Sequence, residues 1–219
     1  MDSPLQGKAM SVNLPASFPA PIVDLSFPRH WHAQILPARP LILPTRHFVY
    51  PLQAEEVERG ALEVLIRPEQ QRPAIDDQSA PERSSSAREF LATCALGFRD
   101  PAAPTGLWST PNPEEICAVS GGYAYIIDTT APERFTMIAY RPVLEIRPLP
   151  AQNLLLFVAH HSILAWGAKG QAWQSEKLSH EGVTITAIEG SILHGLGWNL
   201  LTDKETPFAL DLQTGLRLT

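Results

Sequence analysis

The second half of the chain is a series of short apolar runs separated by Gly, Pro or polar residues. Such runs match the length of β-strands, and the intervening residues are those that tight turns prefer. Nearer the N-terminus, Leu62, Val64 and Ile66 occupy every second position, which predicts a strand with one buried face. The strands expected from residue 90 onward are residues 90–98, 106–109, 116–119, 123–127, 135–140, 143–146, 154–158 and 183–188.

An internal repeat organises the last third of the chain. The tripeptide Ser-Ile-Leu occurs at residues 162–164 and again, 29 residues later, at 191–193, and Trp and Gly follow each copy. Other apolar segments recur at 35 to 39 residues. Spacings of this size are typical of β-propeller blades. About three units fit into residues 90–219, and a closed propeller needs roughly four or more, so an incomplete ring, a sandwich and a barrel all stay open.

Residues 208–215, with the sequence Phe-Ala-Leu-Asp-Leu-Gln-Thr-Gly, resemble the outer hairpin of propeller repeats of the quinoprotein kind. In those repeats an Asp and a Thr-Gly pair frame a turn between two strands. Asp211 and Thr214 can bond the local backbone in such a turn, and Gly215 can supply the positive φ that many hairpins need. The resemblance implies a hairpin and carries over no quinone-binding residue.

These patterns predict an all-β protein of mainly antiparallel short strands, with an incomplete β-propeller-like or sandwich body and a proline-rich N-terminal arm. The arm, residues 1–44, combines many Pro with many apolar residues, so we expect it to lie extended against a surface, preferably that of its own domain. Residues 45–68 are expected to be a strand-containing segment that packs on the body. Residues 69–89 are expected to form a mobile polar loop, and residues 90–219 to form the β-rich body with loose blade-like repeats.

Composition narrows the class of protein further. The 21 prolines disfavour long helices, and the net charge of -6 offers no basic footprint for nucleic acid. Cys94 and Cys117 show no metal-binding spacing, so we expect both to be reduced and buried or half-buried. The first residues lack the apolar core of a signal peptide, and no segment reaches a membrane-spanning length. The expectation is a cytoplasmic protein without membrane contact.

His30 and His32 are the candidate metal ligands. Side chains two apart on an extended segment project from one face, which is a way to present two imidazoles to one ion. A third ligand would have to come from elsewhere in the fold, with His47, Asp24 and His194 as candidates. No ligand-spacing motif surrounds the pair, so ordinary surface histidines are the competing interpretation and the cofactor stays unknown.

Other chemical motifs are weak. Ser120-Gly121-Gly122 lacks the Gly two positions before the serine that a nucleophile elbow requires, and it predicts a turn. Glu114 and Glu115 also lie in an expected turn, where solvent exposure is commoner than paired acid and base chemistry.

Trp31, Trp108 and Trp166 are the candidate binding residues. Aromatic rings stack on the apolar faces of sugars and anchor protein interfaces when they are exposed. The alternative is that most of the tryptophans fill the core between sheets.

Three functions from different classes follow. The first, which we favour, is a non-catalytic protein-interaction or structural module that binds a protein partner, or a second copy of itself, through the N-terminal arm and β surface. The second is a metal-dependent enzyme that uses His30 and His32, and the third is a carbohydrate or small-ligand binding β protein. The preference for binding rests on the lack of catalytic spacing and on the apolar arm, because an extended segment preorganised by Pro loses less entropy on association.

Overall fold

The computed structural model describes residues 19–54, 60–69 and 89–218. This part of the chain contains sixteen strands, one 3₁₀ turn, η2 (Pro150–Gln152), and no α-helix. The prediction of an all-β protein built from short strands is therefore confirmed. Most of the expected mobile loop, residues 70–88, lies outside the described residues, as do residues 1–18 of the expected arm.

The strands form four small sheets, here called sheets I to IV. Sheet I, the first in the stack, pairs β4 in antiparallel fashion with both β2 and β5, whereas β3 pairs in parallel with β5. Its strands, in spatial order, are β2 (Trp31–Leu36), β4 (Ala61–Pro68), β5 (Phe90–Ala95) and β3 (His47–Tyr50).

Sheet II is an antiparallel meander with one additional strand, β1, that pairs in parallel with β6. Because β1 belongs to sheet II and β2 to sheet I, the N-terminal segment joins two sheets. Two strands of the expected arm, β1 and β2, thus pair with strands of the chain's own sheets. The strands of sheet II are β1 (Ile22–Asp24), β6 (Gly106–Ser109), β7 (Glu115–Ser120), β8 (Tyr123–Asp128) and β9 (Phe135–Met137).

Sheets III and IV are simple antiparallel meanders. The repeated Ser-Ile-Leu falls at β12 and β15, and each of these strands lies between the strands that precede and follow it in the sequence. Sheet III contains β10 (Glu145–Leu149), β11 (Leu154–Val158), β12 (Ile163–Gly167) and β13 (Gly170–Gln174), and sheet IV contains β14 (Val183–Glu189), β15 (Ile192–Asn199) and β16 (Lys204–Asp211).

The turn expected after residue 210 is present. The Asp211 carboxylate accepts the backbone N–H groups of Gln213 and Thr214 and the Thr214 hydroxyl, at 2.8–2.9 Å. Gly215 has a φ of 72°, and the chain then returns to form a bridge between Leu210 and Arg217. Local side-chain bonding by Asp and Thr, together with a left-handed Gly, is what closes this hairpin.

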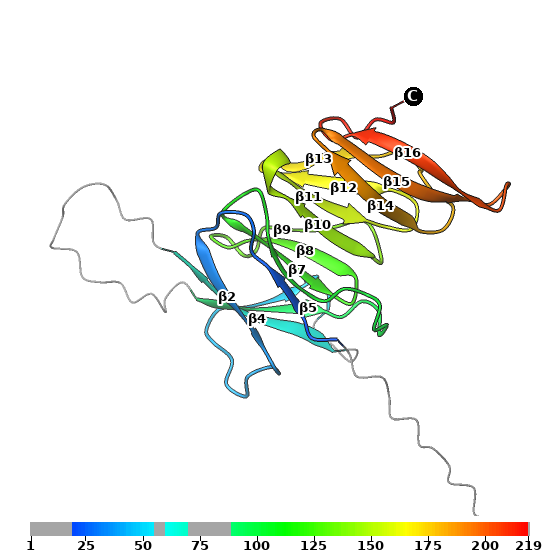
Figure 1. Ribbon diagram of the computed structural model, residues 1–219. Coiled ribbons are helices and arrows are strands. Elements are labelled where there is room, and N and C mark those ends of the chain that lie inside the picture. Colours follow the sequence, from blue (N-terminus) through cyan, green and yellow to red (C-terminus); the bar gives the residue numbers. More distant parts are fainter. Residues whose placement is uncertain (1–18, 55–59, 70–88, 219) are drawn as a thin grey trace, which may run out of the picture.

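The four sheets follow one another along the molecule (Figure 1). Three hydrophobic clusters occupy the spaces between successive sheets. In β7, Ile116 and Ala118 face sheet I, whereas Cys117 and Val119 face sheet III. Alternate residues of a strand point to opposite faces, so a strand buried on both faces must be apolar throughout. The central strands β7 and β8 of sheet II and β11 and β12 of sheet III are buried in this way, whereas in β14 of sheet IV the buried Val183 and Ile185 alternate with exposed threonines.

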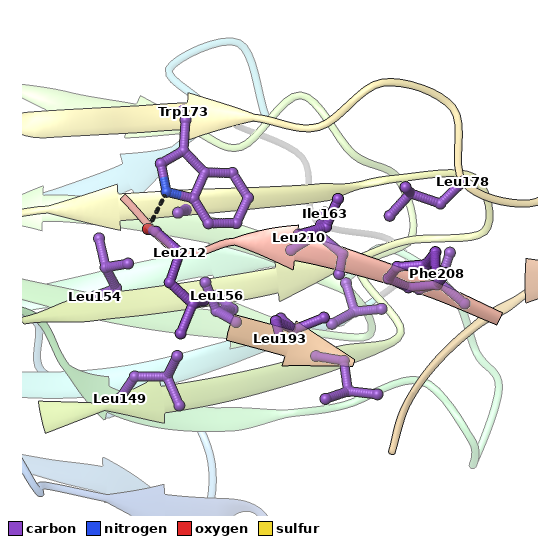
Figure 2. Packing of buried hydrophobic residues seen from close by; sticks show 14 residues of the cluster. Leu149, Leu154, Leu156, Ile163, Trp173, Leu178, Leu193, Phe208, Leu210 and Leu212 are labelled. Carbon is purple, nitrogen blue, oxygen red and sulfur yellow. Dashed lines mark hydrogen bonds between the residues drawn. The ribbon is translucent and has the colours of Figure 1, made fainter. Parts of the chain in front are cut away.

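Figure 2 shows the cluster between sheets III and IV. Trp173 of β13 is buried and donates its indole N–H to the carbonyl oxygen of Leu212 at 2.7 Å. The ring also packs over Gly215, where a Cβ atom would lie 2.5 Å from a Trp173 ring carbon. The C-terminal hairpin is therefore attached to sheet III as well as to sheet IV.

The stack of sheets is open at both ends. Figure 1 places sheet I and sheet IV at opposite ends, and among the described residues no hydrophobic cluster joins these two sheets. Cys94 and Cys117 are both free and buried, as expected. In the described part of the chain, no helix is long and apolar enough to span a membrane.

Candidate functional site

His30 and His32 flank the start of β2 and point away from the core, but each pairs with a different carboxylate. His30 Nδ1 lies 2.7 Å from Glu114 Oε1, and His32 Nε2 lies 3.1 Å from Glu69 Oε1. Among residues 19–54, 60–69 and 89–218, no three His, Cys, Asp or Glu side chains come together as a metal site requires. The third ligands considered from the sequence, His47, Asp24 and His194, do not join the pair.

Trp31, Trp108 and Trp166 are buried, with exposed fractions of 0%, 2% and 6%. Trp31 fills the space between sheets I and II, whereas Trp108 and Trp166 lie between sheets II and III. A stacking platform for a sugar needs an exposed ring face. These three rings instead contribute to the cores that hold the sheets together.

Two of these tryptophans meet at Glu115, the first residue of β7. The Trp31 indole N–H donates to the backbone carbonyl of Glu115 at 3.1 Å, and the Trp166 indole N–H donates to its carboxylate at 2.9 Å. Glu115 is therefore not a solvated turn residue, as the sequence suggested, but a strand residue that joins three sheets. Burial raises the pKa of its carboxyl, and the hydrogen bond from Trp166 opposes that rise.

A polar cluster lies on the outward face of sheet I. Glu63 of β4 is 5% exposed and Thr93 of β5 is fully buried, although both face away from the hydrophobic cluster between sheets I and II. The Thr93 hydroxyl donates to Glu63 Oε2 at 2.5 Å, and Arg39 Nε donates to Glu63 Oε1 at 2.9 Å. His47 Nε2 lies 2.8 Å from the Thr93 oxygen.

The number of protons that each side chain can donate fixes the directions of these hydrogen bonds. Thr93 has one hydroxyl proton, which it gives to Glu63, so its oxygen accepts from His47 and Nε2 of His47 carries a proton. Burial, with a further contribution from Arg39, lowers the pKa of His47. Glu63 and Thr93 form hydrogen bonds with each other and with Arg39 and His47. The cluster therefore holds the connection between β2 and β3 to the sheet.

That connection carries Leu41, the most exposed large apolar residue of the described chain. Leu41 and Ile42 have exposed fractions of 105% and 89%, and Leu43 follows at 45%. We call residues 41–43 the apolar tip. Its base is held on one side by Arg39 on Glu63, and on the other by the backbone carbonyl of Arg46, which accepts the N–H of Leu91 at 3.0 Å.

Sequence reasoning counted the apolar tip within the arm but did not separate it from the rest of the arm. It also missed the cluster beneath the tip. The sequence gives no signal for Glu63, because it stands between Leu62 and Val64, at a position where the alternation of β4 predicts an exposed side chain. Thr93 is the only weak signal, since it is the one polar residue of β5.

No family model matches the chain, and no curated protein matches its sequence. Among solved structures, it is similar to the computationally designed protein Ika8, with 12% identity and a TM-score of 0.36 over 59% of this chain and 39% of that one. It is also similar to the N-terminal domain of Nup159, with 12% identity and a TM-score of 0.35 over 91% and 54% of the two chains.

A third similarity is to a chain of the S. cerevisiae complex in which Dbp5 is bound to Nup159, Gle1, IP6 and ADP. It has 10% identity and a TM-score of 0.34, over 85% of this chain and 50% of that one. The chain thus covers little more than half of each matched structure at most. All three TM-scores are below 0.5, so the architecture described above rests on the strand pairing of this chain itself.

Proposed function

We propose that the protein is a non-catalytic interaction module that binds a protein partner through the apolar tip and the adjoining outward face of sheet I. The partner surface that fits is an apolar pocket deep enough to receive Leu41 and Ile42. The single observation that carries this proposal is the exposure of three consecutive branched apolar side chains at residues 41–43. A contiguous apolar patch in water is unfavourable, and such patches mark interaction sites.

The tip is suited to binding because its conformation is restricted. Pro40 and Pro44 bound it, and each fixes one backbone φ angle. The base is tied to sheet I through Arg39 and Arg46. A segment that is already ordered loses less conformational entropy on association, so more of the free energy of apolar burial goes into affinity.

The test compares two double variants of the full chain. Leu41→Asp with Ile42→Asp charges the apolar tip, whereas Leu200→Asp with Leu201→Asp makes the same change in the turn after β15, where both leucines are also exposed. Proteins captured from an extract of the source cells are identified, purified and titrated by calorimetry. We expect the tip variant to bind the purified partner at least about a hundredfold more weakly, since two buried anchors contribute about 1.5–3 kcal/mol each.

Other occupants of the tip give different results. Binding that survives the tip variant and is lost in the control variant would move the interface to sheet IV. Co-sedimentation of the wild type with neutral lipid vesicles, abolished by the tip variant, would replace the protein partner with a membrane surface. Concentration-dependent mass in light scattering, abolished by the tip variant, would identify a second copy of the chain as the partner.

A further inference from the structure

A cavity of about 840 Å³ lies where sheets I, II and III meet beside β1. Its volume falls within the range of about 300–1,000 Å³ that is typical of small-molecule sites. The walls are mostly apolar and come from strands far apart in the sequence. They include Ile35 and Leu36 of β2, Leu62 of β4, Ile22 of β1, Trp108 of β6 and Ile146 of β10. This cavity is separate from the apolar tip, none of whose residues lines it.

Ser120, the last residue of β7, lines the cavity and is fully buried. Among the described residues, its side-chain oxygen is the one buried polar side-chain atom without a hydrogen-bond partner. The backbone carbonyl of Ser120 accepts the N–H of Gly97 at 2.9 Å, so the residue is held in place. A buried hydroxyl without a partner is unfavourable by about 1–3 kcal/mol. A polar group of a bound molecule would remove that penalty.

The charges on the wall restrict the kind of molecule. Asp24, Glu63 and Glu145 line the cavity, and none of its described lining residues is Lys, Arg or His. Glu63 is neutralised by Arg39 and Glu145 by Arg147, whereas Asp24 accepts a backbone N–H from Ser26. Among the described residues, Asp24 is thus the lining carboxylate without a salt bridge, and its negative charge disfavours an anion.

We propose that this cavity binds a small, mainly apolar molecule that is uncharged or cationic and carries one hydrogen-bonding group. The apolar part lies against Trp108 and the leucine and isoleucine side chains, and its polar group bonds the Ser120 hydroxyl. Trp108, which the sequence offered as a binding residue, is among the residues that line the cavity, and its ring is packed in the core between sheets II and III. Most of the affinity comes from the apolar contact, and Ser120 selects for the polar group.

The experiment uses two dyes that share one aromatic framework. N-phenyl-1-naphthylamine is uncharged and has one N–H, whereas 8-anilino-1-naphthalenesulfonate adds a sulfonate. Titration of the full chain is expected to give saturable 1:1 fluorescence with the uncharged dye, at least about tenfold tighter than with the sulfonate, which is a difference of about 1.4 kcal/mol. Excitation of tryptophan should sensitise the bound dye, and Trp108→Phe should reduce that sensitisation.

Variants locate the dye. Ala102 is exposed at the edge of the cavity, so Ala102→Trp should obstruct entry, whereas Ala168→Trp places the same indole on the exposed turn between β12 and β13. We expect the affinity of the first variant for the uncharged dye to be lower by about tenfold or more, and that of the second to equal the wild type's. Leu41→Asp with Ile42→Asp should leave dye binding unchanged, which separates this proposal from that for the apolar tip.

Ser120→Ala gives a signature that a purely structural serine would not give. Removal of an unpaired buried hydroxyl should stabilise the dye-free protein. The same change should reduce the affinity for the uncharged dye severalfold. Equal binding of both dyes, or full binding after Ala102→Trp, would overturn the proposed cavity site. A less stable Ser120→Ala protein would show that the hydroxyl already has a partner, and would overturn its assigned role.

Discussion

Trp166 donates its indole N–H to the carboxylate of Glu115 at 2.9 Å, across the interface between sheets II and III. The same Glu115 accepts the indole N–H of Trp31 through its backbone carbonyl, so one residue connects sheets I, II and III. Both tryptophans have an apolar body and one polar atom that needs a partner when it is buried. Glu115 supplies both partners from a half-buried position at the start of β7.

Glu115→Gln should stabilise the protein at pH 7. Burial raises the pKa of Glu115 in the folded state. The carboxyl therefore ionises at a lower pH in the unfolded chain than in the folded protein, and this ionisation lowers the free energy of unfolding. Gln carries no charge to bury, and its side-chain oxygen can still accept from Trp166. Urea unfolding should show the variant more stable at pH 7, with the difference shrinking as the pH falls through the raised folded-state pKa of Glu115 and absent below about 4.3, the pKa of a Glu in the unfolded chain. A variant that is less stable at pH 7 would contradict this sign.

His47→Gln should reduce the loss of stability between pH 7 and pH 5. The pKa of His47 is lowered by burial and by Arg39, so the unfolded chain takes up the proton first as the pH falls through about 6.5, and folding is disfavoured. A glutamine N–H can replace the imidazole N–H on Thr93. Thermal unfolding across this pH range is the measurement, and His160→Gln, in the exposed turn after β11, is the matched control. An unchanged pH slope in His47→Gln would contradict the prediction.

Trp173→Ala should destabilise the protein by about 3–5 kcal/mol, as large truncations in cores do. The ring lies between sheets III and IV, donates to Leu212 and covers Gly215, so its loss leaves a cavity and an unpaired carbonyl (Figure 2). Trp198→Ala is the matched control, because Trp198 is half-buried and belongs to none of the three hydrophobic clusters. Equal losses in equilibrium unfolding would show that the free face of sheet IV is covered in solution.

Gly106→Ala should destabilise the junction of β1 and β6 by about 1–3 kcal/mol, as overpacking does. A Cβ atom at residue 106 would lie 1.9 Å from the carbonyl oxygen of Ile22, so β1 must move away. Gly167→Ala, also in a strand, places its Cβ no closer than 3.6 Å to a neighbour and should be nearly neutral. Hydrogen exchange of residues 22–24 should rise in the first variant and stay unchanged in the second.

Local sequence patterns were enough to predict the class of fold and many of its strands. The expected strands at residues 106–109 and 154–158 coincide with β6 and β11. Such runs can be located because strand length, turn residues and apolar content are local properties of the chain. The sequence even distinguishes central from terminal sheets, since β11 is apolar throughout whereas β14 alternates.

Which residues contact one another could be learned only from the three-dimensional structure. Glu115 looked like an exposed turn residue, and its role depends on Trp31 and Trp166, which lie 84 and 51 positions away. Ser120 was expected to belong to a turn. In the structure its hydroxyl is buried without a partner, and the residue lines a cavity built from three sheets. The tip at residues 41–43 shares its apolar composition with the rest of the arm. The strands on either side of it pair within sheet I, whereas the tip itself stays exposed to solvent. Contacts between distant segments depend on how the sheets stack, and composition and local periodicity carry no record of that stacking.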